Sequence, residues 1–181
     1  MINSGQMFMK DSRGAALAEL ALVLPLLLVL IMGMLDFGKM FNEWIDETHL
    51  ANEGARLAAV GYLADPTDAT CAANPNVCIA RQIQGDTSIP ELKTGRAVTP
   101  YAGAQGAARV CISYPTNPAT TTHGLVGDPV QVTVATTYHW LNYLVKTIPF
   151  AATPIVGKAT MRLERRATDT AAGMTTCYPA T

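Results

Sequence analysis

The chain has 181 residues, of which 49% are hydrophobic, and its formal net charge is −1. Proteins that bind nucleic acid need clustered lysine and arginine, so the near-neutral charge argues against a nucleic-acid partner. Once a membrane-spanning segment is subtracted, the remaining length suits one modest folded domain.

An apolar segment near the N-terminus is long enough to cross a membrane. From Ala15 to Leu35 the only charged residue is Glu19. As a helix this segment rises by about 30 Å, the thickness of the hydrocarbon core of a bilayer. Lys10 and Arg13 precede it, so the positive-inside rule predicts a single pass with the N-terminus in the cytoplasm and the rest of the chain exported.

The acid inside this segment needs a partner, because a charge in mid-bilayer costs about 2.5–3.5 kcal/mol on insertion scales. If the chain is cut after Gly14, Ala15 gains a free α-amine, and Glu19 lies four residues later on the same helical face. Amine and carboxylate would then pair within one chain or between staggered chains. An uncleaved anchor is an open alternative. A cleaved secretory signal is the other, although "MGMLDFGKMF" is a poor match to its cleavage site.

These residues carry a family resemblance. Gly14, Ala15 and Glu19 before a long apolar helix resemble the processing site of type IV pilin-like proteins. The string "RGAALAELALVLPLLLVLIMGMLDFGKMF" is similar to the TadE/TadG-like proteins of Tad (Flp) pilus systems, and "HLANEGARLAAVGY" resembles a further segment of that family. The matching positions are Arg13, Gly14, Glu19, Pro25, Gly33, Asp36, Phe37, Gly38 and Lys39, whereas Leu20 stands where the family more often has Phe.

The resemblance implies a minor pilin or pseudopilin that takes part in assembling a Tad-type pilus, by initiating it, forming its tip or incorporating subunits. Neither enzyme activity nor a cofactor is expected, because the sequence contains no catalytic motif. Residues 1–14 would be a cytoplasmic leader that prepilin peptidase removes, residues 15–35 a transmembrane helix of the bacterial inner membrane, and residues 36–181 a periplasmic, pilin-like domain. The domain would be extracellular if the protein enters the filament. The implied partners are membrane lipid, prepilin peptidase, other minor pilins, the major pilin and the assembly platform. The alternative is an uncleaved anchor that carries a periplasmic scaffolding or binding domain.

Pro25 interrupts the apolar segment. Inside a helix, proline removes one backbone hydrogen bond and clashes with the preceding turn. Membrane helices tolerate such a kink where neighbouring groups satisfy the freed carbonyl. We expect a kink at this position, which is either merely tolerated or helps the subunit leave the bilayer.

An amphipathic helix is expected over residues 36–62, ended by Asp65-Pro66. Its apolar stripe is predicted to pack on the core, with a surface for a partner as the alternative; the stripe is Phe37, Phe41, Trp44, Thr48, Ala51, Ala55, Ala58 and Tyr62. The polar positions between are Asn42, Glu43, Asp46, Glu47, Asn52, Glu53 and Arg56.

The rest of the chain reads as loops followed by strands. Residues 64–106 are rich in turn residues, with one short helix considered at 77–83. Within residues 107–166, period-two alternation predicts three antiparallel strands, in "RVCISY", "DPVQVTVATTY" and "IVGKATMRLER", and residues 167–181 are expected to be a tail. The fold class is α+β: a long helix packed on a small antiparallel sheet.

Four cysteines follow the apolar segment and suggest disulfides in an oxidising compartment, with three possible pairings. The short spacing of Cys71 and Cys78 favours a bond between them, which leaves Cys111 and Cys177 as the other pair. A zinc site at Cys71 and Cys78 would need two further ligands. No catalytic motif is found, and the three histidines, His49, His123 and His139, are isolated in the sequence.

Overall fold

The computed structural model describes residues 12–62, 67–89, 92–93, 108–119, 122–140, 152–167 and 175–179. Within them a long N-terminal helix precedes a small antiparallel sheet, so the predicted α+β fold class is confirmed. The chain divides into two compact units, Met1–Gly38 and Lys39–Thr181. The second unit is called the folded domain below.

Helix α1 (Ser12–Val60) begins in the first unit and ends in the folded domain. Alanine and leucine, both strong helix formers, are frequent in its first half. The helix ends at Gly61, which has a left-handed φ of 63°, and the N–H group of Tyr62 donates to the carbonyl oxygen of Leu57 at 3.0 Å. This end agrees with the expected position before Asp65-Pro66, which lies outside the described residues, and the glycine cap satisfies the last carbonyl groups of the helix.

Two short helices, α2 (Ala69–Ala73) and α3 (Pro75–Asp86), lie in the region that we expected to be loop-rich. The side chain of Asp68 caps α2 by accepting from the N–H group of Thr70 at 2.8 Å. Asn74 caps α3 in the same way, and Pro75 occupies the first helical position, where proline is favoured. We interpreted Asn74-Pro75 as a turn, but here the pair starts a helix that includes the one considered at 77–83.

The described strands form one antiparallel sheet in the order β3-β2-β1-β4. The strands are β1 (Arg109–Ser113), β2 (Pro129–His139), β3 (Ala152–Arg162) and β4 (Thr175–Pro179). The first three confirm the alternating patterns. Strand β4 corrects the expectation of a tail: five residues are too few for alternation to stand out, and the strand is defined by its pairing with β1, which places Cys177 opposite Cys111.

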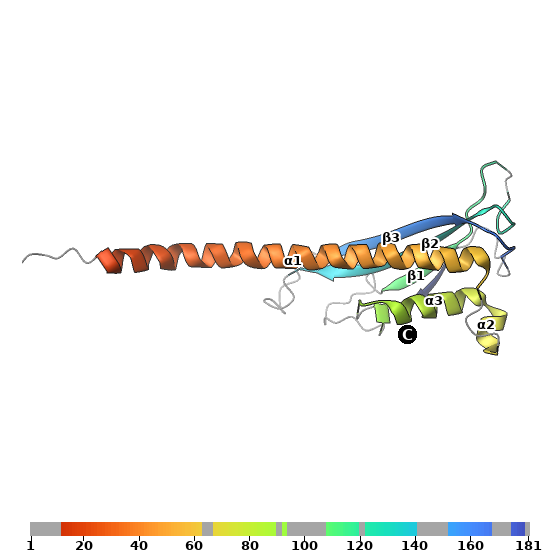
Figure 1. The fold of residues 1–181 in the computed structure, drawn as a ribbon, viewed down its shortest axis with the longest axis horizontal. Coiled ribbons are helices and arrows are strands. Elements are labelled where there is room, and N and C mark those ends of the chain that lie inside the picture. Colours follow the sequence, from red (N-terminus) through yellow and green to blue (C-terminus); the bar gives the residue numbers. More distant parts are fainter. Residues whose placement is uncertain are drawn as a thin grey trace, which may run out of the picture. The chain divides into compact units, whose positions relative to one another are not determined.

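One face of the sheet forms the core. Along β2 the buried positions alternate, and Val130, Val132 and Val134 are fully buried. Within the folded domain, α1 and α3 lie side by side over the sheet (Figure 1). A Cβ atom added to Gly54 of α1 would meet Ile83 of α3 and Val132 of β2, so the three elements share one close contact.

The apolar stripe of α1 is only partly in this core. Ala51, Ala55 and Ala58 are buried, as predicted, whereas Phe41 and Trp44 are about half-exposed, against the prediction. The difference follows from size, because alanine lets a helix approach its neighbours closely and a large ring does not. The aromatic residues of the stripe therefore face outward.

Candidate functional site: an apolar helix and a buried carboxyl group

The predicted processing and assembly residues lie on the first part of α1. Gly14, Glu19 and Pro25 are exposed, and a Cβ atom added to Gly14 would meet nothing within 4 Å. Ala15 belongs to the helix, but its side chain lies outside the described part of the chain. The helix continues through Pro25, which has no N–H group to donate, and the kink there stays a prediction.

The apolar side chains of this segment face outward. An 18-residue window of the helix has a mean hydropathy of 2.6, and only 6% of the window is buried. So large a continuous apolar surface is uncommon on soluble monomers and marks contact with lipid or with another protein. By length and composition the segment is compatible with a membrane anchor.

A second site lies in the folded domain, where the side chain of Glu47 on α1 is fully buried. The hydroxyl group of Thr136 on β2 donates to Oε1 of this carboxyl group, and the backbone N–H group of Gly157 on β3 also donates to it. Oε2 has no hydrogen-bond partner among the described residues. The carboxyl group therefore ties the helix to two neighbouring strands.

A glycine on β3 makes this contact possible. A Cβ atom added to Gly157 would overlap the backbone carbonyl group of Glu47 and would lie 2.7 Å from the backbone nitrogen of Thr48. Any larger residue would push helix and strand apart and weaken the hydrogen bonds of the carboxyl group. Gly157 therefore contributes to the site by leaving room for the backbone of α1 to approach β3 closely.

Burial raises the pKa of Glu47 from its usual 4.5 to about 7. Loss of water around the charged form is the largest cause, and the negative charges of Glu43 and Asp46 act in the same direction. The hydrogen bonds from Thr136 and Gly157 oppose the rise, because they stabilise the carboxylate. The carboxyl group therefore exchanges its proton near neutral pH.

Sequence reasoning missed this residue, since we placed Glu47 among the polar positions of the amphipathic helix. The available clue was its spacing: Glu47 lies four residues before Ala51 and eleven before Ala58, which puts all three on one helical face. An acid at the start of an alanine stripe predicts either a local break in burial or a buried carboxyl group. The structure shows the latter.

The four cysteines form two disulfides, Cys71–Cys78 between α2 and α3 and Cys111–Cys177 between β1 and β4. This is the pairing that the short spacing favoured. Ligand atoms of Asp68, Cys71 and Cys78 lie within 4.8 Å of one another, a group that could hold a metal ion. Because the two sulfur atoms are bonded to each other, they offer no thiolate to zinc, and the group acts as a cross-link.

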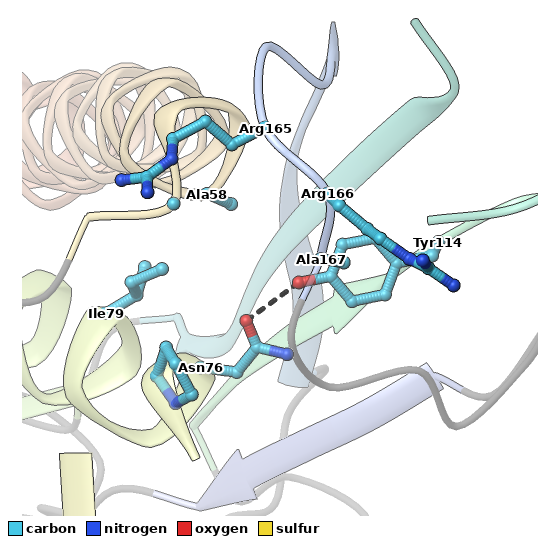
Figure 2. A pocket seen from close by; sticks show the side chains of 9 residues that line it. Ala58, Asn76, Ile79, Tyr114, Arg165, Arg166 and Ala167 are labelled. Carbon is cyan, nitrogen blue, oxygen red and sulfur yellow. Dashed lines mark hydrogen bonds between the residues drawn. The ribbon is translucent and has the colours of Figure 1, made fainter. Parts of the chain in front are cut away.

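A small cavity of about 90 Å³ lies between the end of α1, the start of α3 and the residues after β3. In this cavity the hydroxyl group of Tyr114 donates to Oδ1 of Asn76 at 2.9 Å (Figure 2). Arg165 and Arg166 also line the cavity, but their guanidinium groups point away from one another. The two cations therefore do not converge on a common ligand, and the hydrogen bond gives the polar lining a structural role.

Comparison with known families identifies the N-terminal segment. Residues 14–56 match the model of the TadE-like protein family. This segment is TadE-like. The match lies within α1 and contains both Glu19 and Glu47. No curated protein and no solved structure matches the chain.

The TadE-like match is consistent with a TadE/TadG-like protein, and membership of that family would imply components of a Tad pilus as partners. TadE-like pilus proteins are structural proteins rather than enzymes. The sheet and the two short helices lie outside the TadE-like segment. What the folded domain does must therefore be argued from its own residues.

Proposed function

We propose that the chain is a minor pilin or pseudopilin that takes part in assembling a Tad-type pilus. Residues 15–35 would cross the bacterial inner membrane, with the leader in the cytoplasm and the folded domain in the periplasm. The observation that supports this proposal is the TadE-like helix, whose apolar membrane-length segment is almost entirely exposed. Such a helix needs lipid or neighbouring apolar helices around it. In pilus assembly, the bilayer surrounds the helix first, and the helices of neighbouring subunits surround it afterwards.

Cleavage by prepilin peptidase between Gly14 and Ala15 would give Glu19 its partner. The new α-amine lies one helical turn from the carboxylate, so the two charges would pair within the chain or with a staggered neighbour. Such a pair offsets part of the cost of an acid in the bilayer and sets the stagger between subunits. Other minor pilins, the major pilin and the assembly platform would be the partners in this step.

The folded domain also supports an exported location. Two disulfides in one small domain are typical of oxidising compartments such as the periplasm. Both lie after the apolar segment, on the side that the positive-inside rule assigns to export.

The mass and N-terminal sequence of the protein extracted from membranes test the cleavage. A chain that begins at Ala15 is the expected result. Gly14→Leu is a suitable variant, because the space around Gly14 is open and the substitution leaves the fold undisturbed. We expect this variant to reach the membrane and to keep its leader. A wild-type chain that retains residues 1–14 contradicts the proposal and favours an uncleaved anchor.

Replacing Glu19 by Gln tests the role of the charge. The variant should insert and be cleaved but should assemble few pili, since the amine of Ala15 would have lost its partner. Glu164→Gln, which neutralises an exposed acid of the folded domain, is the matched control and should leave pilus number unchanged. Normal piliation by the Glu19→Gln variant would sink the idea that this carboxylate sets the register.

A further inference from the structure

After the apolar segment of residues 15–35, α1 presents another exposed apolar surface, inside the folded domain. Phe41, Trp44 and Ile45 are 42%, 48% and 60% exposed. Their spacing of three and four residues places them on one side of the helix. The rings of Phe41 and Trp44 meet edge to face, with their centroids 5.8 Å apart. These three residues are called the aromatic patch.

The aromatic patch continues the exposed apolar side chains of the preceding part of α1. Exposed large apolar side chains occur along this helix from Leu17 to Ile45, and the next one is Val60. If residues 15–35 cross the hydrocarbon core, as proposed above, an α-helix places Phe41 about 9 Å and Trp44 about 14 Å beyond the edge of that core. A bilayer measures about 30 Å across its hydrocarbon core and about 40–45 Å with its interfacial layers. The interfacial layer on one side is thinner than these distances, but side chains of a helix lean toward its N-terminus. The rings of the patch therefore point back toward this layer.

The chemistry of the aromatic patch fits a lipid surface better than a second helix. Tryptophan is enriched at membrane interfaces, where its ring sits among apolar groups and its N–H group meets water and headgroups. Exposed Lys39 and Asn42 stand beside the patch and add polar groups at the same level. Helices that pack together in membranes use small residues at their contacts, and the patch contains none.

We infer that the aromatic patch inserts into the headgroup layer on the side of the folded domain and holds this part of α1 at the membrane surface. The inference rests on the membrane anchoring in the proposed function. It adds a lipid contact made by the folded domain itself, beyond the apolar segment.

Fluorescence quenching in vesicles tests the depth of Trp44. The chain has two tryptophans, so Trp140→Phe leaves Trp44 as the only emitter. The full chain is reconstituted into phosphatidylcholine–phosphatidylglycerol vesicles whose lipids carry bromine either near the headgroup or near the chain end. We expect quenching of Trp44 to be about twofold stronger with bromine near the headgroup, as for residues of an aromatic belt.

A tryptophan farther along the same helix is the matched control. In a chain with Trp44→Phe, Trp140→Phe and Val60→Trp, the emitter lies about 24 Å beyond position 44 along α1, and it should respond to aqueous acrylamide but to neither lipid. If Trp140→Phe unfolds the domain, a nitroxide on Ile45→Cys gives the same depth information, since the described cysteines are all in disulfides.

Three results would overturn the inference while the chain still floats with the vesicles. Quenching of Trp44 by acrylamide alone would place the patch in water. Stronger quenching by bromine near the chain end would place it in the hydrocarbon core. Protection from every quencher would mean that protein covers it, for example a second copy of the chain. A chain that fails to float with the vesicles would refute the membrane anchor itself, and the inference with it.

Discussion

The raised pKa of Glu47 should make the stability of the folded domain depend on pH. The carboxyl group binds its proton more tightly in the folded state, with a pKa of about 7, than in the unfolded chain, with a pKa near 4.5. Its contribution to stability is therefore complete below about pH 4.5 and is lost as the pH rises through about 7. At about 1.4 kcal/mol per pH unit, the full loss is about 3 kcal/mol.

Replacing Glu47 by Gln should remove this dependence. The amide oxygen still accepts from Thr136 and Gly157, whereas the amide nitrogen takes the place of Oε2 and adds a cost of about 1–3 kcal/mol that does not vary with pH. Between about pH 5 and about pH 8, the free energy of unfolding of the parent should fall by about 2.5 kcal/mol relative to that of the variant. Part of the full loss already occurs below that range.

Urea unfolding of the full chain in detergent micelles, followed by tryptophan fluorescence at several pH values, measures this difference. Glu164→Gln, at an exposed position, is the control and should follow the parent at every pH. Parallel pH profiles for the parent and Glu47→Gln would refute the reasoning, because they would mean that Glu47 titrates as it does in water.

Further substitutions test the packing, each through the urea midpoint. Gly157→Ala presses a methyl group onto the backbone of α1 and should lower the free energy of unfolding by about 1–3 kcal/mol. Gly85→Ala, in open space on α3, is the control and should be neutral or stabilising. Equal effects of the two substitutions would contradict the close approach of α1 and β3. Replacing Cys111 and Cys177 by Ser should lower the free energy of unfolding by about 4 kcal/mol, because this disulfide joins residues 66 positions apart. Replacing Cys71 and Cys78 should lower it by only about 2 kcal/mol, because their separation is 7 and the disulfide closes a shorter loop. Asp128→Asn should cost about 1–3 kcal/mol, since this carboxylate accepts from two side chains and one backbone N–H group of its own loop; an unchanged midpoint would argue against that network.

Local patterns predicted most of the fold. Alternation of apolar and polar residues predicted β1, β2 and β3, because in each strand one face is buried and the other is not. Strand β4 escaped the prediction, since it is short and its edge position gives it little burial. Its existence depends on a partner strand that lies far away in the chain.

Sequence reasoning predicts the processing residues, whose role stays a prediction, but it missed Glu47. Gly14, Ala15 and Glu19 stand out because their pattern is contained within six consecutive residues. Glu47 does not stand out, because a carboxylate on an amphipathic helix is ordinarily solvated. The exposure of Phe41 and Trp44 was also missed, because a periodic apolar stripe does not indicate how far along the helix the neighbouring elements of the core extend.

The sequence by itself determined the long apolar helix, its small-residue and acid pattern, and the alternating strands, because each of these depends on spacing along a short stretch of chain. Only the tertiary structure decided which acid of the helix is buried. Glu47 meets Thr136, 89 residues later, and the backbone of Gly157 on the adjacent strand. The proton affinity of that carboxyl group follows from the loss of water that this packing causes, and no local pattern contains it.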